Sequence, residues 1–219
     1  MSVLLEPRRA EYPDEGGGER RPALVWPLPP GTVAIASAVL GGGLGPREWV
    51  LNAQVGLDYA HADPDCHVAS IASGLGLRPA CGVGLLTAAS VLDVAVAAEA
   101  GVECAATVGL SAPTWAAAAE EATSSWSAGT INLVCWVPAE LCGAALVNAV
   151  ITATEAKSQC LGEAGLAGTG TASDAIVVCS PAGGSERYGG PRSRWGSRLA
   201  RAVHRAVTAG TATYLAGPR

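Results

Sequence analysis

The sequence predicts an α+β or mixed α/β fold, in which a single domain holds a mixed β-sheet packed with helices. Predicted strands dominate the first two thirds of the 219 residues and occur in runs, so a strict alternation of strands and helices is not supported. A long helix at about 139–162 and a C-terminal amphipathic helix follow these runs. The composition suits a globular domain with a sizeable core, because 49% of the residues are hydrophobic and only 15% are charged.

The first part of the chain, residues 1–22, is interpreted as a flexible tail, and residues 23–215 as the single domain. The tail holds acids, prolines and three consecutive glycines where a signal peptide would need an apolar core. No stretch of the chain reaches the roughly 18 uncharged apolar residues that a membrane-spanning helix needs. We therefore expect a cytoplasmic protein without a membrane span.

The first predicted elements after the tail are two strands and a helix. Residues 32–40 are rich in β-branched and small side chains, and residues 47–55 form the second strand. Their short connection suggests a hairpin, although "GGGLGP" is too long and too rich in glycine for a tight turn alone. Asp63 suits the N-cap of a helix with Pro64 at its first position, and this helix extends to about Leu75.

Three further strands precede the long helix, at residues 81–89, 101–111 and 129–138. Pro138 ends the last strand and permits the helix to begin just beyond it. The segment "GTGTASDAIVVCS" is then a glycine-rich loop that leads into another strand. The closing helix, "SRLARAVHRAVTAG", places arginines on one face and aliphatic residues on the other.

Charge and cysteine content exclude several kinds of partner. A net charge of -5 gives no long-range attraction to phosphate backbones, so we expect no nucleic-acid partner. The seven cysteines are scattered without a CxxC spacing, and most stand in apolar surroundings. They are expected to be free thiols that act as small hydrophobic side chains.

The long helix carries a stripe of polar residues. Spacings of four, three and four place them on one helical face, with Lys157 nearby: Asn148, Thr152, Glu155 and Gln159. A solvated face is one interpretation of this stripe. A ligand-binding face is the other, because the solvated face of the last helix uses arginine, while asparagine and threonine are poor helix formers.

Lys157 is the only lysine among the 14 lysines and arginines of the chain. An ammonium group can lose its proton when it is desolvated, and a guanidinium group cannot. Lys157 is therefore a candidate base, acid or compact hydrogen-bond donor. The alternative is a surface cation without a special role.

Two other segments hold residue types that carry chemistry. The segment "DYAHADPDCH" is rich in metal-ligand types, but helix capping accounts for two of its aspartates and no HExxH-like spacing is present, so we expect no metal site. His67 in this segment is a candidate general base or a structural histidine. The loop "GTGTASD" offers backbone N–H groups and polar side chains that could hold an amide carbonyl or stabilise an oxyanion, or it is simply a connection. Its polar side chains are Thr169, Thr171, Ser173 and Asp174.

Seven segments carry a more specific pattern, in this order along the chain: "GGGLGPREWVLNAQV", "GVGLLTAA", "ATVGLS", "GTINLVCWVP", "ALVNAVITATEAKSQ", "GTGTASDAIVV" and "GGPRSRWGSRLARAV". Together they resemble the adenosylcobinamide amidohydrolase family of corrinoid salvage, from about Thr32 to Ala209. The resemblance implies hydrolysis of the amide that joins aminopropanol to a propionate side chain of the corrin ring. The product would be adenosylcobyric acid, which is reused in coenzyme B12 synthesis.

The needs of amide hydrolysis suggest roles for the candidate residues. Glu155 or His67 would activate the attacking group, Lys157 would stabilise charge or protonate the amine, and Asp174 belongs to the loop that holds the amide. Residues expected to contact the corrinoid are Asn52, Asn132, Asn148, Thr152, Thr169, Thr171, Ser173 and Trp49. The corrinoid is the substrate, no cofactor is expected, and a homo-oligomer is compatible with the sequence. A non-catalytic corrinoid-binding protein, or an amidase or acyltransferase for another small amide, are the alternatives.

Overall fold

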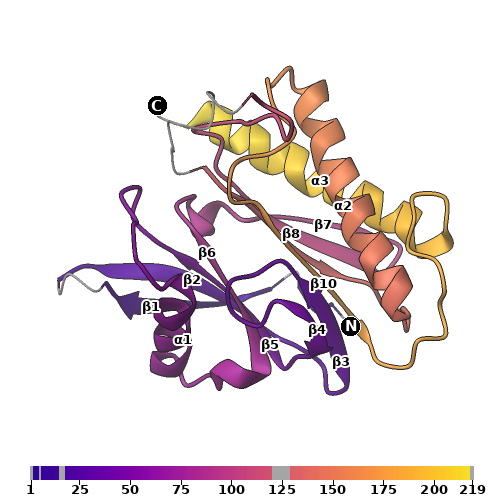
Figure 1. Ribbon diagram of the computed structural model, residues 1–219, viewed down its shortest axis with the longest axis horizontal. Coiled ribbons are helices and arrows are strands. Elements are labelled where there is room, and N and C mark those ends of the chain that lie inside the picture. Colours follow the sequence, from indigo (N-terminus) through magenta and orange to yellow (C-terminus); the bar gives the residue numbers. More distant parts are fainter. Residues whose placement is uncertain (1, 5, 15–17, 120–128, 218–219) are drawn as a thin grey trace.

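The computed structural model describes residues 2–4, 6–14, 18–119 and 129–217. Within them, two β-sheets face each other and helices cover their outer faces, which confirms the predicted α+β class (Figure 1). The smaller sheet has the strand order β1 (Arg8–Pro13), β2 (Arg20–Pro27), β5 (Trp49–Gln54) and β6 (Gly82–Thr87). The larger sheet has the order β4 (Gly43–Pro46), β3 (Thr32–Ala36), β10 (Ala175–Pro181), β9 (Ile131–Trp136), β8 (Val102–Val108) and β7 (Ala95–Glu99). The helices are α1 (Pro64–Gly74), α2 (Gly143–Glu163) and α3 (Arg194–Ala216), with 3-10 turns at Pro79–Cys81 and Val91–Asp93.

The space between the sheets is filled by one face of each, because alternate residues of a strand point the same way. Trp26 on β2, Val50 on β5 and Leu85 on β6 pack there against Val134 on β9 and Val177 on β10. Both sheets mix pairing directions, since β5 runs parallel to β6 and β9 runs parallel to β10 while the other pairs are antiparallel. At one rim the C-terminal ends of β5 and β6 lie near the N-terminal ends of β9 and β10.

The outer faces are covered by the helices. The helix α1 packs on the smaller sheet, and α2 and α3 lie side by side across the larger one (Figure 1). The predicted amphipathic face of α3 is buried there through Leu199, Val203 and Val207. None of the described helices is both long and apolar enough to cross a membrane.

The expected hairpin between residues 32–40 and 47–55 is wrong, because the two strands belong to different sheets. The glycine-rich connection instead forms β4, which pairs antiparallel with β3. Gly41 and Gly43 adopt φ values of 67° and 80°, a region that favours glycine, so the chain can turn twice and leave for the other sheet.

The segment expected to be a flexible tail contains ordered structure. The strand β1 pairs with β2, and Tyr12 is buried with its hydroxyl donating to the carbonyl of Gln54 at 2.6 Å. Leu4 is fully buried, and its carbonyl accepts a hydrogen bond from the indole of Trp26 at 3.1 Å. Single apolar residues among charged ones anchor this segment. Such a pattern has neither the period of a helix nor that of a strand, so the sequence did not reveal it.

The predicted helix boundaries agree with the structure with small differences. Pro64 begins α1, and Asp63 precedes it without a side-chain cap hydrogen bond. The long helix begins at Gly143, later than the expected start near Ala139, because Cys142 donates its N–H to the carbonyl of Glu186 at 2.9 Å and so ties residues before the helix to a distant loop. The strands β1, β2, β4 and β7 were not predicted.

Candidate functional site

The loop between α2 and β10 brings the only lysine to a carboxylate. Lys157 projects from α2 and forms an ion pair with Asp174, the residue before β10. Both side chains are largely buried, at 6% and 12% exposed. The structure therefore unites two residues that the sequence marked separately, and it places the lysine inside the molecule rather than on its surface.

The carboxylate of Asp174 is fixed by further donors. Its Oδ1 accepts the N–H of Ile131 at 2.9 Å, and its Oδ2 accepts the N–H of Thr171 at 3.1 Å. The hydroxyl of Thr171 lies 2.6 Å from Oδ1 and 2.7 Å from the carbonyl oxygen of Gly129. Charge-assisted bonds of this kind hold an ionised carboxylate in one orientation, so Asp174 orients the ammonium of Lys157.

A cavity of about 420 Å³ opens beside this pair. Hydroxyl groups of Thr154, Ser158 and Thr169 line it together with Lys157. The hydroxyl of Ser158 donates to the carbonyl of Thr169 at 2.9 Å, which fastens the loop to α2. An ammonium has three donors, and Asp174 takes one of them, so the site can offer positive charge and donors to an uncharged polar group such as an amide carbonyl.

Glycine at position 170 leaves room for the ion pair. A Cβ atom at Gly170 would lie 2.3 Å from both Lys157 Nζ and Asp174 Oδ2. The glycine-rich composition of the loop therefore has a local steric reason here. The loop is more than a flexible connection.

The polar stripe of α2 lies on a different face from Lys157. Thr152, Glu155 and Gln159 line a second cavity, of about 610 Å³, between α2 and α3. Glu155 is exposed there, and Thr152 donates to the carbonyl of Gly189 at 3.0 Å. Asn148 is exposed one turn earlier on the same helix. The stripe shares one face as predicted, but the structure does not bring Glu155 to the cavity of Lys157.

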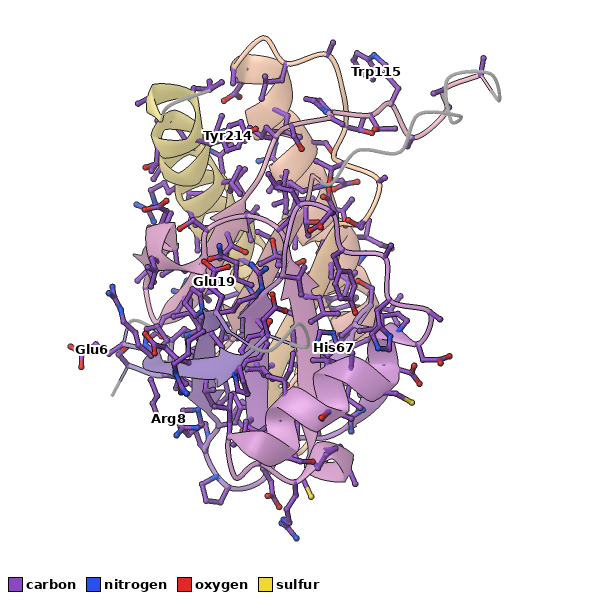
Figure 2. The ribbon with its side chains drawn as sticks, turned by 90° about the vertical axis from the view of Figure 1, so that its left-hand side faces the viewer. Glu6, Arg8, Glu19, His67, Trp115 and Tyr214 are labelled. Carbon is purple, nitrogen blue, oxygen red and sulfur yellow. The ribbon has the colours of Figure 1, made fainter. Side chains whose placement is uncertain are left out.

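His67 lies in a third location. It is buried on α1, with Nδ1 3.0 Å from the hydroxyl of Tyr59, and its ring stacks with that of His61 at a centroid distance of 5.1 Å. Figure 2 shows His67 beside α1, far from Trp115 on a loop at the opposite end of the molecule. Among the described residues, no group of three or more histidine, cysteine, aspartate or glutamate side chains is arranged to hold a metal ion.

Asn52 and Asn132 meet between the two sheets. Asn132 donates to the Oδ1 of Asn52 and to the carbonyl of Leu86, both at 3.0 Å, and Asn52 donates to the hydroxyl of Thr107 at 3.0 Å. The Oδ1 atom of Asn132 is buried without a hydrogen-bond partner in the described part of the chain. Trp49, by contrast, is buried on the outer face of the smaller sheet, where its ring covers Gly82.

A cavity that the sequence did not predict lies at the rim of the two sheets. It measures about 220 Å³ and is lined by Tyr59, Thr87 and Thr130 as well as by Ser173. Only Ser173 was a candidate from the sequence. Hydroxyl side chains at the ends of apolar strands, Thr87 after "GVGLL" and Thr130 before "INLVCW", were the signal that could have located it.

Two buried cysteines are poor nucleophiles. A hydrogen bond with Cys104, together with burial, raises the pKa of the Cys135 thiol, and burial raises the pKa of the Cys179 thiol. Only a thiolate attacks efficiently, and these groups stay protonated near neutral pH.

Comparison with known proteins places this chain among the amidohydrolases, enzymes that cleave amide bonds with water. The pattern of the adenosylcobinamide amidohydrolase family matches residues 7–218, and the chain belongs to this family. An adenosylcobinamide amidohydrolase of Methanosarcina mazei is 30% identical over 190 residues, which cover 82% of this chain and 90% of the relative. An uncharacterised protein of Methanocaldococcus jannaschii is 36% identical over 87 residues, covering 36% of this chain and 34% of that protein.

Proposed function

We propose that this enzyme hydrolyses the aminopropanol amide of adenosylcobinamide and releases adenosylcobyric acid and aminopropanol, in the salvage of cobinamide for coenzyme B12. Membership of the family and the name of the Methanosarcina mazei relative support this substrate. The observation that carries the proposal is the pairing of the only lysine with Asp174 beside a hydroxyl-lined cavity. We propose further that the reaction needs no metal apart from the cobalt of the substrate, so a chelator should leave turnover unchanged.

The reaction has simple requirements. Water adds to the amide carbonyl carbon, the carbon–nitrogen bond breaks, and the carboxylate forms. The two protons that the water loses end on the leaving nitrogen, which departs as an amine and is an ammonium group near neutral pH. The developing oxyanion needs donors and the leaving nitrogen needs an acid. In the proposed arrangement the ammonium of Lys157 supplies one of these, and Asp174 is the positioning residue that holds it.

The size of the cavity indicates which part of the substrate enters. Pockets that enclose a drug-sized ligand measure about 300–1,000 Å³. At about 420 Å³, the Lys157 cavity has more than enough room for the arm that carries the amide and aminopropanol, and in this proposal the larger corrin ring stays at its mouth. The hydroxyl groups of Ser158 and Thr169 can meet the hydroxyl and amide of this arm.

A pair of matched variants on α2 tests this assignment. Lys157→Gln removes the ammonium, and Glu155→Gln removes a charge two residues away that faces the other cavity. We expect Lys157→Gln to lower kcat by about 100-fold or more, the usual effect of losing a donor to an oxyanion, and Glu155→Gln to stay near the wild-type rate. Release of aminopropanol from adenosylcobinamide is followed by chromatography and mass spectrometry, and circular dichroism confirms that both variants fold.

The opposite result would assign the reaction to the other cavity. A normal rate in Lys157→Gln together with a large loss in Glu155→Gln would place the chemistry in the cavity between α2 and α3. Lys157→Arg adds a second test, because arginine keeps the charge but cannot act as an acid near neutral pH. Restored turnover in that variant would assign Lys157 to charge stabilisation rather than to proton donation.

A further inference from the structure

The 220 Å³ cavity at the rim of the sheets is next to the Lys157 cavity but on the other side of the same loop. Ser173 lies in a turn directly before Asp174. Ser173 lines the rim cavity and Asp174 lines the cavity of Lys157. A ligand that bridges this loop would reach both cavities.

The walls of the rim cavity are uncharged. No charged side chain is among its described lining residues, which include Val39, Val55, Tyr59 and Leu85. Such walls disfavour a phosphate or carboxylate, because a buried charge needs a partner. Flat apolar surface with one aromatic ring suits a neutral aromatic group.

Hydroxyl groups at one side of the cavity add polar recognition. Ser37 accepts the N–H of Ile176 at 3.0 Å, and Thr87 accepts the N–H of Ala89 at 3.0 Å. Because a hydroxyl group can accept and donate hydrogen bonds at the same time, each of these two hydroxyl groups can still donate its own proton. Ser173 and Thr130 lie at the cavity too, with their hydroxyl oxygens 2.8 Å apart.

Asn132 adds an acceptor behind this wall. It pairs in register with Ala175 and donates to the carbonyl of Leu86, and both of these residues line the cavity. Its Oδ1 atom has no partner among the described residues, although the residue is only 1% exposed. Asn132 does not itself line the cavity, so this buried acceptor lies behind the residues that a ligand would contact.

We propose that the rim cavity binds the 5′-deoxyadenosyl group of the substrate, a purine nucleoside, and so selects adenosylated corrinoids. This inference rests on the proposed function. The cavity is smaller than the roughly 300–1,000 Å³ of pockets for whole ligands, so it takes one group of the corrinoid. A purine combines a flat apolar body with donors and acceptors on its edge, which matches apolar walls that carry hydroxyl groups.

The test introduces larger side chains that occupy part of the rim cavity. Ala38 is half-buried and lines the rim cavity, and Ala38→Leu would occupy part of it. Ala69 is a half-buried alanine on α1 that does not line this cavity, so Ala69→Leu is the matched control. Val39, which is 50% exposed at the cavity, provides a second filling variant, Val39→Trp, with less risk to the fold.

Two measurements separate this inference from the proposed function. Calorimetry with 5′-deoxyadenosine alone should show binding to the wild type and the Ala69→Leu control, and at least about tenfold weaker binding to the filled variants. The kcat/KM for adenosylcobinamide should also fall about tenfold or more in those variants, while that for cyanocobinamide analogues without the adenosyl group stays within about twofold of the wild type.

Each outcome has a defined meaning. If the wild type releases aminopropanol but the filled variants bind 5′-deoxyadenosine normally and keep the same preference, the adenosyl site is wrong. If calorimetry shows that aminopropanol binds to the wild type and binds more weakly to the filled variants, and 5′-deoxyadenosine does not bind, the cavity holds the leaving arm. This result also overturns the inference. If the wild type cleaves neither corrinoid, the proposed function fails, and nucleoside binding alone then supports or overturns the cavity assignment.

Discussion

Gly170 sets the geometry of the Lys157–Asp174 pair at the scale of single residues. A methyl group there would approach both charged groups to 2.3 Å. The ammonium of Lys157 stands at the end of a flexible chain and can move away, but the carboxylate of Asp174, which is held by three other donor contacts, must shift as well. The pair would therefore lose its orientation, and some of the hydrogen bonds to Asp174 would be weakened.

We therefore expect Gly170→Ala to reduce kcat by about tenfold or more, since misplacement of a reacting group by about 1 Å is costly. A moderate fall in melting temperature should accompany this loss, because the shifted carboxylate of Asp174 weakens its hydrogen bonds. Steady-state kinetics and thermal unfolding of the same preparation check this. A variant whose rate is normal would show that the orientation of Lys157 is unimportant to turnover, whereas a large fall in melting temperature would make the glycine a structural requirement.

The residues of the candidate site were predictable only in part. Lys157 is conspicuous as the only lysine, and Asp174 ends a polar loop, but no local pattern links residues 17 positions apart. Glu155 and Lys157 looked like partners because they are close in sequence. Positions two apart on a helix point to nearly opposite sides, which is why the two residues line separate cavities.

Among the elements, the edge strand β7 is tied to α3 by charged groups. Arg205 and Arg201 contact Glu99, and Arg205 also donates to the carbonyl of Ala98 at 3.0 Å. Hydrogen bonds from Arg205 and then Arg201 lower the pKa of Glu99 below its ordinary value of 4.5. A carboxyl group whose pKa is lower in the folded chain than in the unfolded chain stabilises the fold at pH values above its unfolded-state pKa. This contribution is lost as the pH falls through its folded-state pKa.

We expect the melting temperatures of the wild type and Glu99→Gln to differ at about pH 7 and to converge as the pH falls below about 4.5. The difference should shrink in high salt, because these groups are exposed and screened. Scanning calorimetry across this range, at low and high salt, gives the answer. A difference that persists unchanged at about pH 3 would assign the effect to packing rather than to charge.

The elements that the sequence predicted well are those buried on both faces or along one full stripe. The strands β8, β9 and β10 are continuous apolar runs, and α3 has a clear amphipathic face. Of the missed strands, β2 lies inside the smaller sheet, and β1, β4 and β7 are edge strands with weaker patterns, such as "GLGP" and "AVAAE". Their conformation depends on the neighbouring strand more than on their own residues.

At the scale of the whole molecule, the N-terminal segment joins the two sheets. Glu103 on β8 of the larger sheet is buried, and its Oε2 accepts the N–H groups of Val3 and Leu4 at 3.0 and 2.6 Å. Leu4 itself is fully buried and contacts Trp26 of the smaller sheet. The segment therefore both donates hydrogen bonds to a buried carboxylate and fills part of the hydrophobic core.

A chain that lacks residues 1–6 should lose about 3 kcal/mol or more of unfolding free energy, because it leaves a cavity at Leu4 and an unsatisfied buried carboxylate. Urea unfolding of the full and shortened chains measures this difference. Leu4→Ala in the full chain separates the apolar part from the carboxylate part. An unchanged unfolding midpoint in the shortened chain would show that the segment contributes nothing to stability.

The division into two sheets could not be predicted from the sequence, although the fold class could. Alternation and apolar runs identify strands, but they do not say which strands pair. The strand β5 lies between β2 and β6, and β10 lies between β3 and β9, so the pairing is set by contacts between distant parts of the chain. The family, in contrast, was predictable because its motifs are local runs of sequence.

The loop that ends at Asp174 gives this enzyme a simple route to new preferences. Residues on one of its sides are tied together by ion pair and hydrogen bonds, so a change there disturbs several partners at once. The other side faces walls contributed by separate segments, near Ala38, near Val55 and near Tyr59, whose hydroxyl lies 3.0 Å from His67 Nδ1. Laboratory selection for altered corrinoids should therefore accumulate substitutions in those walls while leaving Lys157 and Asp174 unchanged.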